Sequence, residues 1–134
     1  MENITKKEMV RNAFESLGYK LAVDEDGDFF LRYELKTIYV LGTDCDDDFF
    51  SLLLPRIYTV DDDDPAVVML VCNKLTRDLK IAKYFLNESL ECVNVSCEFF
   101  CSDEQSLKNS IEHSLDVLGI ASSKFRLVLE EAKK

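Results

Sequence analysis

Cysteine is the residue type in this sequence with the clearest potential for site chemistry. Three of the five cysteines, Cys92, Cys97 and Cys101, fall within one strand-like segment and its end. A structural zinc site needs four ligands, usually with a tight cysteine knuckle, so a fourth ligand would have to come from elsewhere. Alternation along a strand also places Cys97 on the opposite face from Cys92. The pattern therefore favours thiols that fill a core as small apolar groups.

Two acidic runs could bind a cation. Aspartates at alternate positions of residues 44–48 imitate the opening of a calcium loop. Phe49 stands where such a loop needs glycine, and Pro55 stands where it needs a bidentate glutamate. The second run covers residues 61–64. We therefore expect solvated turns that bind no calcium tightly, with weak cation binding as the alternative.

His113 is the only histidine, so acid–base catalysis by this residue type would have to centre on it. It lies in a predicted helix between Glu112 and Ser114, beside the apolar stripe of that helix. A catalytic histidine needs an oriented partner, and no sequence signature of a serine or cysteine nucleophile accompanies this one. The four glycines are too scattered for a phosphate-binding loop. We therefore expect a solvated helix residue and no enzyme active site.

The overall composition narrows the possible partners. The chain has 134 residues, the size of one domain, and a net charge of −10. This acidity disfavours nucleic acids and anionic membrane surfaces, which attract lysine and arginine. The longest apolar run, Ala66 to Cys72, is far shorter than the about 20 residues of a membrane span. The N-terminus lacks the apolar stretch of a secretory signal, and the odd cysteine count favours reduced thiols. We therefore expect a single cytoplasmic domain over residues 1–134, without a cofactor.

Helix signals and alternating residues define the elements of the first half of the chain. Thr5 and Glu8 form a capping box that begins a helix over residues 6–17, and Gly18 ends it. A period of two then predicts strands over residues 19–22, 29–34, 37–41 and 49–60. Proline cannot donate to a strand ladder, so Pro55 requires the last of these strands to be bulged or at a sheet edge.

The second half begins with another helix. Asp64 is the predicted N-cap and Pro65 the first helical residue of a helix that continues to about Leu79. Residues 81–86 and 90–100 then form a hairpin around residues 87–89. The second arm places two sets of side chains on opposite faces: Val93, Val95, Cys97 and Phe99 on one, and Asn94, Ser96 and Glu98 on the other.

Ser102 is the predicted N-cap of the final helix, in which Gly119 could produce a kink or an interruption. The buried stripe of this helix is expected at Leu107, Ile111, Leu115 and Leu118. The element order is thus α-β-β-β-α-β-β-α, with room for one further short strand. This order predicts an α+β fold, with a mainly antiparallel sheet and the helices packed against one side of it.

Two short segments resemble the YbjN-like family, which is also described as a group of candidate bacterial sensory transduction regulators. Asn73 and Leu75 match the Asn-x-Leu-Asn-like turn at the end of the family's helix, while Thr76 replaces the second asparagine. The Lys-Tyr-Phe of residues 83–85 matches its strand with a lysine–aromatic pair. The resemblance covers nearly the whole chain, because the element order is also the family's. It implies the fold of type III secretion chaperones, no established catalytic residues, and a structural role for Asn73 near the helix end.

We interpret the chain as a non-enzymatic protein-binding module, a small chaperone-like or regulatory adaptor protein of bacterial type. Its partner would be another protein or peptide. The alternative is a small-molecule or metal-dependent enzyme that uses the acidic loops and the cluster of Cys92, Cys97 and Cys101. The lack of converging polar residues in the sequence favours the binding module.

The helix that begins at Pro65 indicates where a partner would bind. The apolar run of residues 66–72 occupies every side of this helix, whereas a helix on a sheet needs only one apolar stripe. Either the C-terminal helix or a second copy in a homodimer would cover the outward side, and the resemblance favours the dimer. The expected interface residues are Val67, Val68, Met69 and Val71, with the strand face of Asn94, Ser96 and Glu98 as the other option.

We predict that all five cysteines are reduced, and that replacing them with alanine or serine leaves the fold intact. Thiol titration under denaturing, non-reducing conditions should return five thiols per chain. A lower number, in a sample never exposed to an oxidant, would contradict this prediction.

Overall fold

The computed structural model describes residues 4–134, which contain three helices and six strands. In chain order these are α1 (Lys6–Ser16), β1 (Ala22–Val23), β2 (Phe29–Tyr33), β3 (Lys36–Leu41), β4 (Phe49–Thr59), α2 (Pro65–Asp78), β5 (Ala82–Leu86), β6 (Cys92–Phe100) and α3 (Glu104–Ala132). The predicted order and the α+β class are confirmed, and β1 is the further short strand. The strand expected over residues 19–22 begins only at Ala22.

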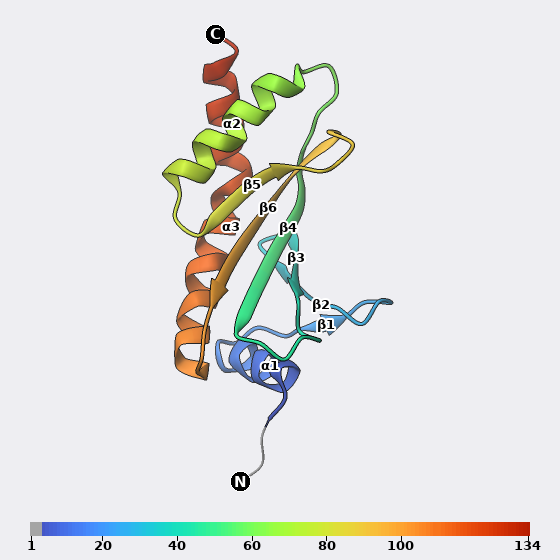
Figure 1. The fold of residues 1–134 in the computed structure, drawn as a ribbon, viewed down its shortest axis with the longest axis vertical. Coiled ribbons are helices and arrows are strands. Elements are labelled where there is room, and N and C mark those ends of the chain that lie inside the picture. Colours follow the sequence, from blue (N-terminus) through green and yellow to red (C-terminus); the bar gives the residue numbers. More distant parts are fainter. Residues whose placement is uncertain (1–3) are drawn as a thin grey trace.

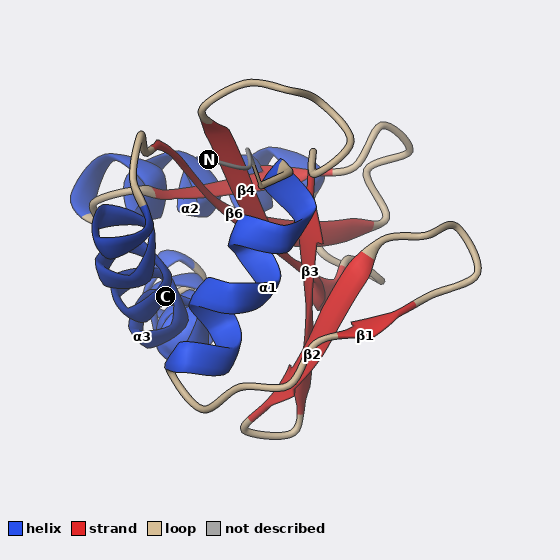
Figure 2. Ribbon diagram, turned by 90° about the horizontal axis from the view of Figure 1, so that it is seen from below, coloured by secondary structure: helices blue, strands red, loops and turns tan. Residues whose placement is uncertain are grey.

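A single antiparallel sheet holds all the strands, in the order β1-β2-β3-β4-β6-β5. The three helices gather on one side of it (Figures 1 and 2). The long helix α3 runs beside β4, β6 and β5, with α1 packed near its N-terminal end and α2 near its C-terminal end (Figure 1). The opposite face of the sheet carries no helix from the described residues.

Side chains on the helix side of the sheet form one hydrophobic core with the helices. The expected alternation in β6 is present, because Val93, Val95 and Cys97 are fully buried there. The stripe of α3 is buried as predicted, and it continues to the end of the helix through Ala121, Phe125 and Leu129. Burial of a large apolar side chain contributes roughly 1.5–3 kcal/mol, so this stripe is a major source of stability. Among residues 4–134, none of the helices combines the length and apolar character that a membrane-spanning helix needs.

The strand β4 lies in the middle of the sheet, between β3 and β6. Its register with β6 shifts between Leu54 and Tyr58, so Pro55 lies in a bulge and not at an edge. Arg56 adopts a left-handed backbone conformation with φ of 54°, and its amide donates to Asn94 Oδ1 on β6 at 2.9 Å. The Asn94 side chain therefore replaces a ladder carbonyl where the proline interrupts the pairing.

Two details of α3 differ from the expectation. Its N-cap is Asp103 instead of Ser102, and the Asp103 carboxylate accepts a hydrogen bond from the Ser106 amide at 2.8 Å. Gly119 does not break the helix, which continues from Glu104 to Ala132. The glycine gives room to the turn between β2 and β3, because a Cβ at this position would lie 3.3 Å from a carboxylate oxygen of Glu34.

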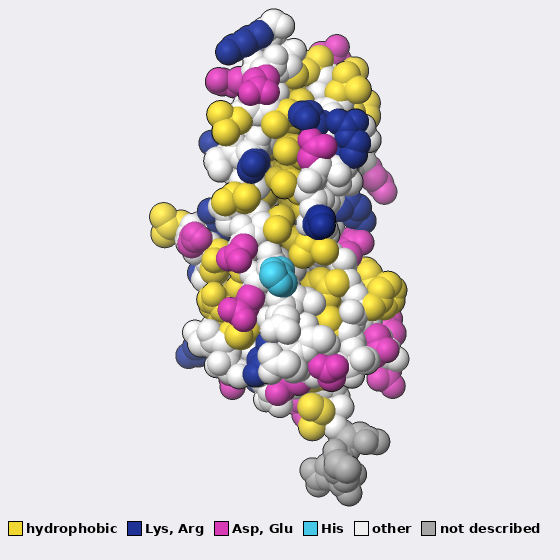
Figure 3. Space-filling view, turned by 90° about the vertical axis from the view of Figure 1, so that its left-hand side faces the viewer, with side chains coloured by type: hydrophobic (Ala, Val, Ile, Leu, Met, Phe, Trp, Pro, Cys, Tyr) yellow, Lys and Arg dark blue, Asp and Glu magenta, His cyan; other side chains and the backbone are white. Residues whose placement is uncertain are grey.

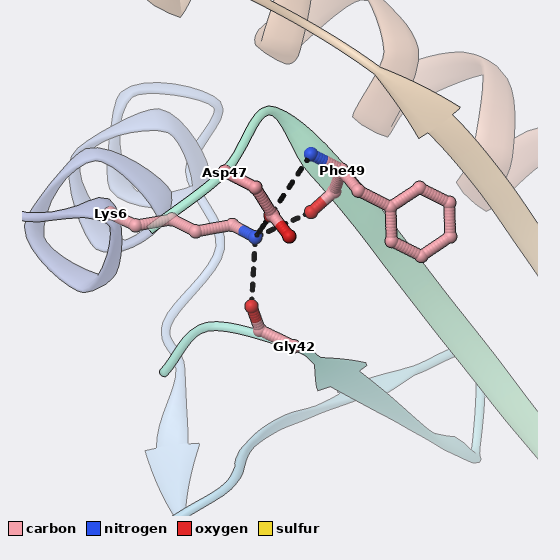
Figure 4. A network of polar contacts seen from close by, with 4 residues as sticks. All are labelled: Lys6, Gly42, Asp47 and Phe49. Atoms are coloured by element: carbon pink, nitrogen blue, oxygen red, sulfur yellow. Dashed lines mark hydrogen bonds and ion pairs between the residues drawn. The ribbon is translucent and has the colours of Figure 1, made fainter. Parts of the chain in front are cut away.

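The side chain of Lys6 joins α1 to the loop between β3 and β4 (Figure 4). Its Nζ donates to the carbonyl of Gly42 at 2.8 Å, to Asp47 Oδ1 at 2.6 Å and to the carbonyl of Phe49. The ammonium group also lies 4.8 Å from the centroid of the Phe50 ring. One aspartate of the first acidic run thus holds a buried cation of the protein itself.

The hydrogen bond from Lys6 lowers the pKa of Asp47 below its ordinary carboxyl value. A carboxyl group whose pKa is lowered by folding stabilises the folded state above its unfolded pKa. This contribution is lost as the pH falls through the lowered pKa of the folded protein. The Lys6–Asp47 pair therefore stabilises the fold at neutral pH and not in strong acid.

We predict that Lys6→Met lowers the free energy of unfolding by about 2 kcal/mol at neutral pH, because hydrogen bonds to charged groups contribute roughly 1.5–3 kcal/mol. Lys7→Met is the matched control, since Lys7 is itself half-exposed and pairs with the exposed Asp44, which should contribute little. Urea unfolding measures both variants. Equal losses in the two would contradict a structural role for Lys6, as would a loss that does not shrink when the pH is lowered below the carboxyl range.

Candidate protein-binding surface

The apolar run of α2 divides between the core and the surface. Val68 and Val71 are buried in the domain's own core, so they cannot contact a partner of the folded chain. Val67 is partly buried against the same core. Met69 is 48% exposed and Leu70 is 69% exposed. Of the residues expected at an interface on this helix, Val68 and Val71 therefore belong to the core, and Met69 lies on the outward side, next to Leu70.

Local interactions at both ends of α2 fix this orientation. The Asp64 carboxylate accepts a hydrogen bond from the Ala66 amide at 3.0 Å, which caps the N-terminus as expected. Near the other end, Thr76 Oγ1 accepts from the Tyr84 amide at 2.9 Å and donates to the Tyr84 carbonyl at 3.3 Å. Thr76 therefore has the structural role that was expected of Asn73, which is exposed on the helix surface.

A groove of about 390 Å³ lies between α2 and the β5–β6 hairpin. Leu90 in the hairpin turn is 41% exposed and adds a third accessible apolar side chain beside Met69 and Leu70. We call this region the α2–β5 groove; its lining residues are Met69, Cys72, Asn73, Thr76, Tyr84, Phe85, Leu86 and Leu90. Strand β5 is an edge strand, so its free side borders the groove.

The other expected interface, on the outer face of β6, carries polar groups that bond to one another. Glu98 accepts from Lys83 Nζ at 2.9 Å and from Ser96 Oγ at 2.9 Å. Ser96 is only 2% exposed, and Asn94 is occupied by the Arg56 amide. Asn94, Ser96 and Glu98 lie on one face of the strand, as expected, but their side chains form hydrogen bonds with other groups of the sheet.

The cysteines of β6 and its end point to different neighbours. Cys92 Sγ lies 3.9 Å from Asn94 Oδ1, Cys97 Sγ lies 4.0 Å from the carbonyl of Ser114, and Cys101 Sγ lies 3.4 Å from Ser110 Oγ. Burial raises the pKa of the Cys97 thiol to about 11, and that of the Cys72 thiol likewise to about 11. Thiols with such pKa values are protonated at neutral pH, and the thiolate is the reactive form.

The second acidic run also has structural partners. Asp63 accepts hydrogen bonds from the Tyr58 hydroxyl and, at 2.6 Å, from Lys133 near the C-terminal end of α3. These donors lower the pKa of Asp63. Asp64 is occupied as the N-cap of α2. Within residues 4–134, no group of three His, Cys, Asp or Glu side chains has a geometry that could hold a metal ion.

His113 is exposed on α3, at the centre of the face shown in Figure 3. It lines an apolar pocket of about 390 Å³ together with Ile81, Phe99 and Val117, and with Ser110 and Asp116 one helical turn away on either side. A serine, a histidine and an aspartate thus share one helix face, which sequence analysis missed. No hydrogen bond joins these three side chains in the described part of the chain, so they do not form a nucleophile and its base.

Neither a family model nor a curated protein matches the chain. Solved structures do. An uncharacterized protein from Methanothermobacter thermautotrophicus is 14% identical, with a TM-score of 0.56 over 94% of this chain and 98% of that one. A chain of the HopA1–SchA chaperone–effector complex is 12% identical, with a TM-score of 0.58 over 92% of each chain.

YbjN from E. coli, described as a proposed transcription regulator, is 14% identical, with a TM-score of 0.53 over 95% of this chain and 90% of that one. The chain shares the fold of YbjN. The resemblance expected from the residues around Asn73 and Lys83 is therefore confirmed at the level of the fold, as is its relation to the chaperone–effector complex. At these identities the likeness describes the architecture of the chain and assigns no binding partner.

We predict that Thr76→Val loosens the edge of the sheet, because both polar backbone groups of Tyr84 lose a partner. The free energy of unfolding should fall by about 1–2 kcal/mol, and the Tyr84 amide should exchange its hydrogen faster. Thr59→Val is the control, since Thr59 is exposed on β4 and its hydroxyl forms no hydrogen bond in the described structure. Unchanged Tyr84 exchange in Thr76→Val would show that the hydroxyl does not hold this edge.

Proposed function

We propose that this protein is a non-enzymatic binding module, of the adaptor or small-chaperone type, that receives an apolar segment of another protein in the α2–β5 groove. The observation that carries the proposal is the pair of exposed apolar side chains Met69 and Leu90 that line this groove, with Leu70 exposed next to Met69 on α2. Exposed apolar patches on soluble domains mark sites of interaction. A helix packed beside a strand also forms an apolar groove, one of the surfaces that peptides commonly recognise.

The fold supports this reading, since one of the similar chains belongs to a chaperone–effector complex. The chemistry of the described side chains supports it too. The thiols of Cys72 and Cys97 have raised pKa values, and the aspartates of the acidic runs are used as caps and ion-pair partners. The alternative reading, an enzyme that uses the acidic loops and the cysteine cluster, would need these groups free and close together. We also propose a cytoplasmic location, on the odd number of cysteines.

A second copy of the chain is a further candidate occupant of the outward side of α2. A two-fold axis near Leu70 would bury the same apolar residues from both subunits, as isologous interfaces do. Burial of Leu70 in such an interface would contribute more free energy than burial of Met69, because a larger fraction of Leu70 is exposed. The homodimer is therefore proposed through Leu70 and Met69, and not through Val68 or Val71.

We predict that Met69→Asp abolishes dimerisation and partner capture while preserving the fold, because Met69 lines the groove and a charge in an apolar interface has no partner. Ile120→Asp is the matched control: Ile120 on α3 is 45% exposed, close to the 48% of Met69, and does not line the groove. Light scattering at tens of micromolar measures the oligomeric state. Affinity capture from a native lysate, compared between the two variants, measures partner binding.

A protein retained by the wild type and by Ile120→Asp, but lost with Met69→Asp, would support the groove as the binding site. Equal capture by all three chains would contradict it. A monomer at every concentration would contradict the homodimer and would leave the proposed binding of another protein unaffected. Val68→Asp would not discriminate, because Val68 is 0% exposed and its replacement would unfold the domain.

A further inference from the structure

The sheet opens between β3 and β4. The two strands pair only through Tyr39, Val40 and Leu41 of β3, opposite Leu53, Leu52 and Ser51 of β4. The first half of β3, residues 36–38, has register partners on β2 alone. In Figure 1 the strands β1 to β3 lie beside the lower part of β4, and β4 continues past them. The β4 side of residues 36–38 therefore has no strand partner.

The bulge in β4 is the cause of this opening. From Leu54 onward β4 pairs only with β6, and the tie between the Arg56 amide and Asn94 Oδ1 holds the bulged backbone on that side. The φ of 54° at Arg56 turns its side chain out of the regular alternation of the strand. The bulge thus both separates β4 from β3 and presents a guanidinium group at the gap.

The gap is a pocket of about 380 Å³. We call it the sheet-gap pocket; its lining residues are Lys36, Thr37, Tyr39, Leu54, Pro55, Arg56, Ile57, Ser122 and Arg126. Helix α3 supplies two of them, and Ser122 Oγ donates to the carbonyl of Ile57 at 3.4 Å, which fixes α3 against β4 at this point. The volume falls in the range of small-molecule sites, about 300–1,000 Å³, and exceeds what a bare inorganic ion requires.

Positive charge converges on this pocket from three elements. Lys36 comes from β3, Arg56 from β4 and Arg126 from α3. Within residues 4–134 none of the three forms an ion pair, although Glu34 and Glu130 are close to them in the sequence. The only hydrogen bond from these side-chain groups is a long one, 3.5 Å, from Lys36 Nζ to a backbone carbonyl.

One further basic residue lies on the strand next to the pocket. Arg32 on β2 is the register partner of Thr37, and Thr37 lines the pocket. In a chain with a net charge of −10, the three basic residues that line this one opening are a local concentration of the opposite charge, with the Glu34 carboxylate nearby against Gly119 of α3. Guanidinium groups bind phosphate and carboxylate oxygens through paired hydrogen bonds, which adds strength and geometric selectivity.

We propose that the sheet-gap pocket binds a small organic oxyanion that carries two or more phosphate or carboxylate charges. Arg56 and Arg126 bind its oxygens, Lys36 adds a third charge, and the apolar side chains of Leu54 and Ile57 contact its carbon skeleton. The site shares no lining residue with the α2–β5 groove, so it does not depend on the proposed protein-binding function. Tyr39 also lines the pocket.

The test is isothermal titration of the full chain, at physiological salt, with an organic bisphosphate, fructose 1,6-bisphosphate, in one arm and citrate in the other. One-to-one binding of either probe is expected, and the tighter probe identifies phosphate or carboxylate as the recognised group. Backbone amide signals of Thr37, Ile57 and Ser122 should shift on titration, because these residues line the pocket. The absence of binding in both arms would overturn the proposal.

Arg126→Gln and Lys36→Gln should each weaken binding about tenfold or more, the loss expected of a charged hydrogen bond. Lys124→Gln is the matched control, since Lys124 is an exposed basic residue of the same helix that does not line the pocket. All three positions are at the protein surface, so circular dichroism should show the same fold in each variant. Equal weakening by Lys124→Gln and Arg126→Gln would mean attraction by overall charge, and would overturn the site.

Discussion

The packing of α3 along β4, β6 and β5 is the interaction on which the rest of the structure depends. Phe125 lies at its centre, 5.0 Å from the ring of Tyr58 and 6.4 Å from that of Tyr84. The Tyr84 hydroxyl donates to the carbonyl of Ala121 at 3.1 Å, which satisfies a buried polar group at the same contact. Because α3 covers this much of the inner face, α2 can bury only one side against it. Met69 and Leu70 lie on the side of α2 that faces away from this packing.

A sheet covered on one face must stabilise the other face without a helix. The outer face does so in part with paired side chains, such as Lys83 with Glu98 and the tilted aromatic pair of Phe49 and Phe100, whose ring centroids are 5.3 Å apart. The central strand β4 also has to accommodate Pro55, and the Arg56 amide is satisfied by Asn94. This arrangement keeps β4 paired with β6 around the bulge, where β4 no longer pairs with β3.

Local signals predicted most of the elements, and long-range pairing accounts for what they missed. The alternation of Val93 to Phe99 and the Asp64–Pro65 helix start need only neighbouring residues, and both were read correctly. The run of residues 66–72 contains no polar residue to mark its outward side, so Val68 and Met69 could not be told apart. Pro55 fitted a bulge or an edge equally well until the strand order was known. Lys36, Arg56 and Arg126 are far apart in the chain, and only the strand pairing and the α3 packing bring them together.

Both candidate sites lie where the hydrogen-bond ladder of the sheet ends. At each of them, a side chain from a helix forms a hydrogen bond with the backbone of the strand. At the β5 edge, Thr76 of α2 bonds to Tyr84, and at the β3–β4 gap, Ser122 of α3 bonds to Ile57. Unpaired strand edges invite association, so a fold that leaves them open must cover, charge or use them. The first is bordered by Met69 and Leu70 and suits an apolar partner. The second is surrounded by cations, which repel one another when the pocket is empty and are neutralised when it holds an anion. Binding there should therefore stabilise the part of the sheet that the bulge at Pro55 weakens.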